Sequence, residues 1–224
     1  MRLKLLSTVT FTLFGFTCGT VRSAVIYESA TLGETGITKS QVFSQDVPAS
    51  NVAHFNFVGV RFEVTKKAAV ERIGGHFVGG FDKDSFFGAL IRLTDSLDFP
   101  DSEDLSTPDV LGWTLMSFPN PSEEIFSSLQ VELTPGWYAV LFGSGLFGAD
   151  GRGGVVRNGN DIGTPEYIIW QSGSGWINLD DLGDDRVRGN RRFVVEGVLM
   201  PEPATSLLAL ITLSIVAVRR RVRS

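Results

Sequence analysis

The segment Leu129-Gln130-Val131-Glu132-Leu133-Thr134-Pro135-Gly136-Trp137-Tyr138-Ala139-Val140-Leu141-Phe142 has the pattern of two β-strands joined by a tight turn. Apolar and polar residues alternate from Leu129 to Leu133, which is typical of a strand with one buried face. Thr134-Pro135-Gly136 supplies turn residues, and an apolar, aromatic-rich run follows them. The segment therefore predicts a strand–turn–strand unit.

The rest of the body repeats this signal. Val58-Gly59-Val60-Arg61-Phe62-Glu63-Val64 alternates in the same way, and only residues 122–129 hint at helical spacing, in a stretch too short and serine-rich to form a helix alone. Many short strands without helices between them predict an all-β fold, either an antiparallel β-sandwich or a jelly roll, as one domain over residues 24–199. The further candidate strands are 25–27, 69–78, 86–94, 111–118, 166–170 and 192–199.

The first 23 residues have the pattern of a signal peptide. Met1-Arg2-Leu3-Lys4 is basic, and residues 5–17 form an apolar run of the length that secretion requires. Small residues then favour cleavage by signal peptidase after Ser23. The single cysteine, Cys18, admits a lipoprotein alternative, which is disfavoured because Phe16 and Thr17 stand before it where small residues are expected. Cleavage after Ser23 predicts an exported body without a disulfide.

The last 25 residues combine a proline motif, an apolar run and a basic end. Pro201, Glu202 and Pro203 precede residues 204–218, for which we predict a transmembrane helix that starts after the prolines. At about 1.5 Å per residue it is shorter than the hydrocarbon core, a mismatch that local thinning of the bilayer accommodates. The tail 219–224 begins with the membrane stop Arg219, Arg220 and Arg221, and basic flanks stay in the cytoplasm.

This C-terminal segment resembles the PEP-CTERM sorting signal of exported proteins in Gram-negative bacteria that make extracellular polysaccharide. The resemblance implies recognition and processing by an exosortase, a membrane peptidase. It also implies a precursor held in the inner membrane and a product at the cell surface or secreted into the extracellular matrix. An ordinary membrane helix without processing is the alternative. Fragments 136–145 and 192–197 resemble uncharacterised domains attached to this signal, a resemblance that implies no activity.

The charge of the body restricts its partners. Without residues 1–23 and 200–224 the chain keeps 13 Lys and Arg against 24 Asp and Glu, a net charge of about −11. Nucleic acids and anionic lipid surfaces repel such a body. The composition therefore predicts no nucleic-acid partner.

Patterns that would indicate catalysis are weak. Gly143-Ser144-Gly145-Leu146-Phe147-Gly148 matches a dinucleotide fingerprint, but the glycine-rich residues after it cannot form the helix that binds a pyrophosphate. Two histidines and one cysteine leave few nucleophiles or general bases. We therefore predict no catalytic residues and no cofactor, and keep a secreted glycan-active hydrolase as the alternative, since carboxylates are abundant.

Two acidic loops suggest a cation. Asp95, Asp98, Asp101 and Asp104 crowd the first loop, and carboxylate oxygens are the ligands that Ca²⁺ prefers. The second loop spans residues 180–185. Neither has EF-hand spacing, so a plain solvated loop is the alternative. The segment 158–163, rich in Asn and Gly, favours a turn.

Aromatic residues give the remaining functional hint. Tyr167, Trp170 and Trp176 lie about a hairpin-like turn, and exposed indole faces stack on sugar rings. The alternative places Trp170 in the core and Trp176 at its edge. Trp113 and Trp137 lie within predicted strands and are expected in the core. Together these features predict an exported structural, adhesive or glycan-binding protein.

Overall fold

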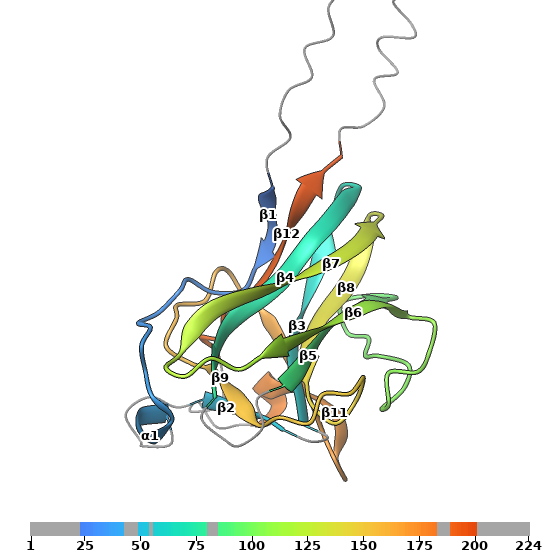
Figure 1. Cartoon of the computed structure of the whole chain (residues 1–224). Helices are drawn as coiled ribbons and strands as arrows, with labels where there is room; N and C mark the ends of the chain where they lie inside the picture. Colours follow the sequence, from blue (N-terminus) through green and yellow to red (C-terminus); the bar gives the residue numbers. More distant parts are fainter. Residues whose placement is uncertain (1–22, 43–48, 54–55, 80–84, 183–188, 201–224) are drawn as a thin grey trace, which may run out of the picture.

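The computed structural model describes residues 23–42, 49–53, 56–79, 85–182 and 189–200 (Figure 1). The predicted signal peptide up to residue 22, the sorting motif, the transmembrane segment and the basic tail lie outside these residues. Within the described part of the chain, no helix is long and apolar enough to cross a bilayer.

Strands dominate the described chain. The only helical elements there are two single turns, α1 (Lys39–Val42) and η1 (Leu179–Leu182). The strands are β1 (Ala24–Glu28), β2 (Ala49–Val52), β3 (Asn56–Val64), β4 (Ala68–Val78), β5 (Ser85–Leu93), β6 (Val110–Ser117), β7 (Glu123–Leu133), β8 (Gly136–Gly143), β9 (Gly153–Val156), β10 (Glu166–Gln171), β11 (Gly175–Asn178) and β12 (Phe193–Leu199).

These strands form two antiparallel sheets, one of which is curled into a half-barrel. The first has the order β1-β12-β4-β9-β2, with β7 also paired to β4, and the second has the order β11-β10-β3-β8-β5-β6. The expected all-β, antiparallel fold class is confirmed at this level. In residues 122–129, the one stretch with a hint of helical spacing, residues 123–129 instead belong to β7.

The strand–turn–strand unit at 129–142 is present, but its strands belong to different sheets. β7 pairs with β4, whereas β8 pairs with β3 and β5. The turn at Thr134 and Pro135 therefore carries the chain from one sheet to the other. β3 and β4 are related in the same way across residues 65–67.

The main core lies between the sheets and follows the period of the strands. On β3, Val58, Val60, Phe62 and Val64 belong to this core. Phe57, which precedes Val58 and points to the opposite face, belongs to a second apolar cluster on the outer side of the same sheet, together with Phe87, Leu141 and Trp170. The centre of this sheet is thus buried on both faces, which explains the unbroken apolar run in β8.

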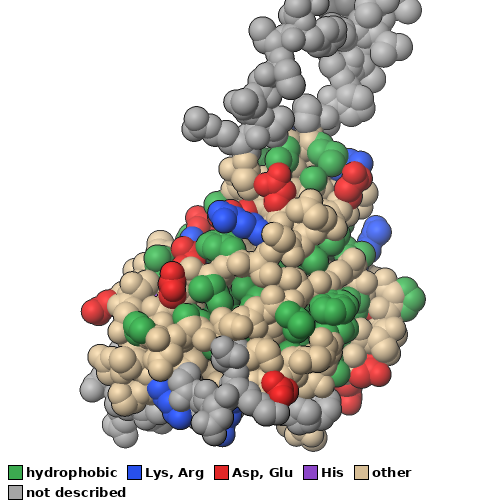
Figure 2. All heavy atoms as spheres, in the orientation of Figure 1, with side chains coloured by type: hydrophobic (Ala, Val, Ile, Leu, Met, Phe, Trp, Pro, Cys, Tyr) green, Lys and Arg blue, Asp and Glu red, His purple; other side chains and the backbone are tan. Residues whose placement is uncertain are grey.

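The surface has a mixed character. On the face shown in Figure 2, acidic and basic side chains lie mainly toward the margins, and hydrophobic side chains gather across the middle. The exposed large hydrophobic residues of the described chain include Leu97, Trp113 and Leu115. The expectation that Trp113 lies in the core is wrong, because this side chain is 46% exposed on β6.

One titratable group is buried in the first sheet. His76 of β4 is 1% exposed, and its Nε2 lies 3.2 Å from Ser122 Oγ, which accepts a hydrogen bond from the Ile37 amide. Burial lowers the pKa of His76, and the nearby Arg192 adds to this effect, while Asn158 and Glu124 oppose it. The folded protein therefore holds His76 neutral.

We expect the stability of the protein to fall as the pH falls below about 6.5, the pKa of an unfolded histidine. The unfolded chain binds the proton first because the folded-state pKa is lower. The free energy of unfolding has its full value above that pH and declines toward the folded pKa, by at most about 1.4 kcal/mol per pH unit. Urea unfolding at pH 7.5, 6.5 and 5.5 measures the slope. His76→Gln should remove it and His54→Gln should keep it; an unchanged slope in His76→Gln would contradict the prediction.

Candidate functional site

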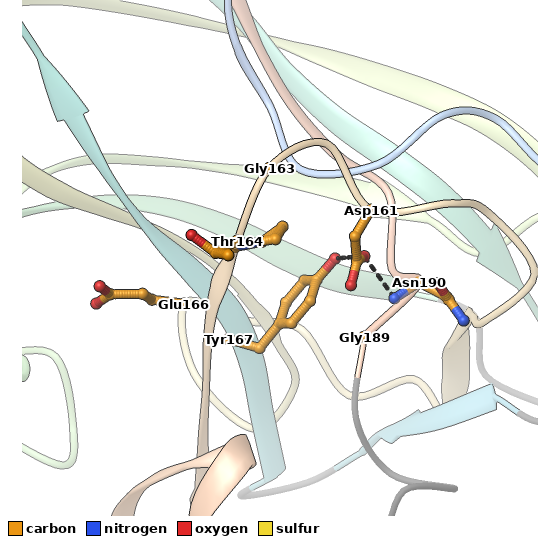
Figure 3. Close-up of a pocket in the computed structure, with 8 residues that line it drawn as sticks. Asp161, Gly163, Thr164, Glu166, Tyr167, Gly189 and Asn190 are labelled. Atoms are coloured by element: carbon orange, nitrogen blue, oxygen red, sulfur yellow. Dashed lines mark hydrogen bonds between the residues drawn. The ribbon is translucent and has the colours of Figure 1, made fainter.

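A polar pocket with a volume of about 530 Å³ lies where two distant segments meet (Figure 3). One segment is the turn that leads into β10, and the other precedes β12. The Gly159 amide donates to the Asn190 carbonyl at 3.2 Å and joins the two segments. Residues that follow β1 contact the same turn: Ala30 bridges Asp161, and the Ile162 amide donates to the Ser29 carbonyl at 2.9 Å. The pocket, named here the Asp161 pocket, is lined by Asp161, Gly163, Thr164, Pro165, Glu166, Tyr167, Gly189 and Asn190.

The carboxylate of Asp161 is held in one orientation. Its Oδ1 lies 2.7 Å from the Tyr167 hydroxyl and accepts the Asn190 amide at 2.6 Å (Figure 3). Its Oδ2 lies over Gly189, where an added Cβ would come within 2.6 Å of it. Within the described residues Oδ2 accepts no hydrogen bond. One oxygen thus anchors the side chain, and the other remains able to accept a bond from a ligand.

The Tyr167 hydroxyl joins the pocket to the core. It accepts the Arg191 amide at 3.2 Å and lies 2.8 Å from the Arg191 carbonyl. With a single proton it donates either to that carbonyl or to Asp161, so its position is fixed from several sides. Burial raises the pKa of Tyr167, and the hydrogen bond and charge of Asp161 raise it further. The phenol therefore stays protonated across the physiological range.

The charges around the pocket differ in their burial. Arg191 is fully buried, with its guanidinium carbon 5.3 Å from the centre of the Tyr167 ring and Nη1 donating to the Gly189 carbonyl at 3.2 Å. Glu166 points away from Asp161 and Tyr167, and its Oε2 lies 3.4 Å from Nε of Arg61 (Figure 3). The rim therefore presents two carboxylates, while the cations lie beneath it or beside it. Anions are repelled by such a rim, and hydroxyl groups find acceptors there.

The structure separates Tyr167 from the two tryptophans of the predicted glycan site, which pair with each other across β10 and β11. Tyr167 lines the pocket from the inner face of β10, whereas Trp170 faces the opposite side and is 5% exposed. The Trp170 ring stacks on the Phe57 ring with centroids 5.2 Å apart. The half-buried Trp176 ring lies 6.4 Å from the Phe57 ring. The two indoles thus have the arrangement of the alternative to a glycan site, with Trp170 in the core and Trp176 at its edge.

The acidic loop uses its carboxylates to bind its own backbone. Asp95 Oδ1 accepts the Leu97 amide at 2.8 Å, and Asp98 Oδ2 accepts both the amide and the hydroxyl of Thr94. Asp104 accepts the amide and the hydroxyl of Ser106 in the same manner. The fourth residue, Asp101, donates its amide to Asp109 Oδ2 at 2.9 Å. These are the bonds of capped turns.

Metal binding in the loop stays a prediction. In the described ranges, no group of three or more His, Cys, Asp or Glu side chains is placed to hold a metal ion. Half of the second acidic loop, residues 183–185, lies outside these ranges.

The remaining sequence patterns have ordinary structural roles. Residues 143–148, which match the dinucleotide fingerprint, end β8 and form a turn without a helix. The stretch 158–163 is a turn as predicted, but it also supplies Asp161, which we did not predict as a site residue. Sequence reasoning also missed Glu166 and Asn190. The available signal was the density of Asn, Asp and Gly before a strand, which is indistinguishable from ordinary turn chemistry.

No model of a known protein family, no curated protein and no solved structure matches the chain.

Proposed function

We propose that this chain is an exported protein of a Gram-negative bacterium whose β-sandwich body binds neutral glycans at the Asp161 pocket. It would act structurally or adhesively at the cell surface or in the extracellular polysaccharide. The proposed organisation is a signal peptide over 1–23, the body over 24–199 and a PEP-CTERM segment over 200–224. The precursor is anchored in the inner membrane and then processed by an exosortase.

The boundaries of the sheets support this organisation. β1 begins at Ala24, directly after the expected signal-peptidase site, and Ala24 pairs with Gly197 of β12. The Met200 amide donates to the Lys67 carbonyl at 2.8 Å, so the folded body extends to the residue before the proline motif. The described strands therefore lie between the two predicted targeting segments.

One observation carries the proposal of glycan binding: a fixed carboxylate with a spare oxygen inside an open polar pocket. Asp161 and Thr164 are exposed, so a ligand reaches them from solvent. Sugar hydroxyls donate to a carboxylate and accept from neighbouring donors, and small-molecule sites orient ligands through a few such groups. The acidic rim favours neutral over anionic polymers.

Thr164→Trp is expected to lower the affinity for neutral oligosaccharides at least tenfold, because the indole fills the pocket mouth and leaves the Asp161–Tyr167 hydrogen bond in place. Isothermal titration with a panel of neutral glucans, galactans and mannans measures the effect. Leu97→Trp, at a position 73% exposed in the acidic loop, is the matched control and should bind like the parent protein. Equal affinity of the parent and Thr164→Trp would overturn the assignment.

The same panel tests the hydrolase alternative. Two carboxylates, Asp161 and Glu166, line the pocket, and glycosidases use carboxylate pairs. An assay for released reducing ends separates the two functions: binding without release supports a binding module, and release that Asp161→Asn abolishes supports the hydrolase.

Processing makes a prediction about the mature chain. In a host with an exosortase, mass spectrometry should find an N-terminus at Ala24 and a C-terminus beyond Met200, because the Met200 amide is still hydrogen-bonded to Lys67, the residue before β4. Replacing Pro201, Glu202 and Pro203 by alanine should leave the precursor in the inner membrane. A mature product that retains Ser224 would contradict processing.

A further inference from the structure

A flat aromatic surface lies on the outer face of β6. Trp113 stacks on Phe147 with ring centroids 4.8 Å apart and an interplanar angle of 13°. Because one indole face is covered, the 46% exposure of Trp113 belongs mainly to the opposite face and the rim. Leu115, two residues along the same strand, is also 46% exposed. These three residues are named the Trp113 platform, and Figure 2 shows hydrophobic side chains gathered across the face where Figure 1 draws β5 and β6.

The loop after β8 is shaped to hold Phe147 under the indole. Phe147 has a φ of 55°, in the left-handed region that bulky residues rarely adopt, between Gly145 at 94° and Gly148 at 84°. The Gly145 amide donates to the Ala149 carbonyl at 2.8 Å and closes the loop. The Phe147 ring also packs edge-on against the Phe87 ring of the second cluster, with ring centroids 5.1 Å apart. Backbone strain of this kind is concentrated at functional sites.

Polar groups border the platform at one end. Ser117 pairs in register with Ser85, two pairs beyond Leu115 and on the same face of β6. The Ser85 hydroxyl donates to Asp150 Oδ1 at 2.9 Å and accepts the Asp150 amide at 3.0 Å. Ser117 and Asp150 are exposed, so a hydroxyl and a carboxylate lie beside the apolar surface.

We propose that the Trp113 platform is a second binding surface, for a pyranose ring of a neutral oligosaccharide. The apolar C–H face of the ring would stack on the free face of the indole, and ring hydroxyls would bond to Ser117 and Asp150. A sugar ring has an apolar C–H face and polar hydroxyls at its edge. A flat aromatic surface with a polar border therefore suits a sugar better than a hydrophobic peptide. The carboxylate disfavours anionic sugars.

The platform is distinct from the Asp161 pocket. β10, which contributes Glu166 and Tyr167 to the pocket, and β6 are separated in the sheet order by β3, β8 and β5. Four strand spacings of about 4.8 Å place these strands roughly 19 Å apart. The two sites can therefore be tested by separate variants, and the platform does not depend on the pocket's being a glycan site.

The test is a titration of the ¹⁵N-labelled protein with neutral hexose oligosaccharides. The chain has four tryptophans, and the indole N–H signal missing in Trp113→Thr identifies Trp113. We expect saturable shifts of that signal in the parent protein and in Thr164→Trp, and at least a tenfold loss of affinity at this site in Trp113→Thr. Trp176→Phe, which removes an indole elsewhere, should leave the shifts unchanged.

No shift of the Trp113 signal at millimolar oligosaccharide would overturn the proposal. A shift that is also lost in Thr164→Trp would assign the effect to the pocket instead. Sedimentation of parent and Trp113→Thr tests self-association: a dimer in the parent that dissociates in the variant would show that a second copy covers the platform, and would likewise overturn it. If Trp113→Thr fails to fold, Trp113→Phe identifies the signal and the titration of the parent decides.

Discussion

Phe142→Ala is expected to lower the free energy of unfolding by about 3–5 kcal/mol, because it opens a cavity where both sheets meet. The Phe142 ring is fully buried and lies nearly parallel to Phe193 of β12, with centroids 5.4 Å apart. It also contacts Phe77 of β4 at 4.9 Å and Phe86 of β5 at 6.3 Å. The ring thus joins four strands from two sheets, and its neighbours are too constrained to fill the space.

Urea unfolding followed by tryptophan fluorescence measures this loss. A total stability of about 5–15 kcal/mol is usual for a domain, so the variant should be marginal. Phe126→Ala is the matched control, since Phe126 is half-buried on β7 with the Arg72 guanidinium carbon 4.5 Å from its ring centre. Its loss should be smaller, and equal losses in the two variants would contradict the cavity argument.

Arg192→Met should cost a similar amount, about 3–5 kcal/mol, by leaving two carboxylates without their cation. Arg192 Nη1 lies 2.8 Å from Glu28 of β1, and Nε bonds to Glu124 of β7. Nη1 also donates to the Ala30 carbonyl. The Arg192 side chain is 13% exposed, and the Glu28 and Glu124 side chains are 35% and 21% exposed, so water would replace the guanidinium only in part.

The geometry predicts a graded series. Arg192→Lys keeps the charge but loses the planar fork, so it should fall between the parent and Arg192→Met. Arg72→Met removes the pair with Glu196, in which the Arg72 side chain is 48% exposed, and should cost at most about 1 kcal/mol. Thermal unfolding of the three variants gives the order, and a loss in Arg72→Met as large as in Arg192→Met would refute it.

The Asp161 pocket and Met200, where the described chain ends, lie at opposite ends of β12. The described chain starts and ends at the same end of the body, where β1 and β12 lie side by side (Figure 1). The pocket residues Gly189 and Asn190 lie just before Phe193, the first residue of β12 and therefore at its opposite end. A strand of seven residues is about 23 Å long. In the proposed precursor, the pocket would therefore face away from the bilayer and remain accessible to polysaccharide.

Strand positions followed from local sequence wherever alternation or an apolar run was long. β3, β4, β5, β6, β8, β10 and β12 lie within a few residues of the predicted ranges. The prediction missed β2, β9 and β11, each of four residues, because their strand conformation comes from pairing with neighbours. It also missed the first half of β7, whose serines and glutamates carry no β signal of their own.

The sequence did not indicate which strands pair with one another. The turn at Pro135 is equally compatible with a hairpin and with a crossing between sheets, and only packing against β3, β4 and β5 selects the crossing. The outward position of Trp113 has the same origin, since the face of β6 that meets the core is chosen by the rest of the sheet.

The candidate site likewise depends partly on local sequence and partly on tertiary structure. Local sequence determined that the body is built of strands and turns, because the period of two and the turn residues act over a few positions. The sequence predicted Asp161 only as part of a turn and Trp113 only as part of a strand. Tertiary structure decided that Asp161 meets Tyr167 and Asn190, and that Phe147 lies under Trp113, because these contacts join segments that only the packing of the sheets brings together.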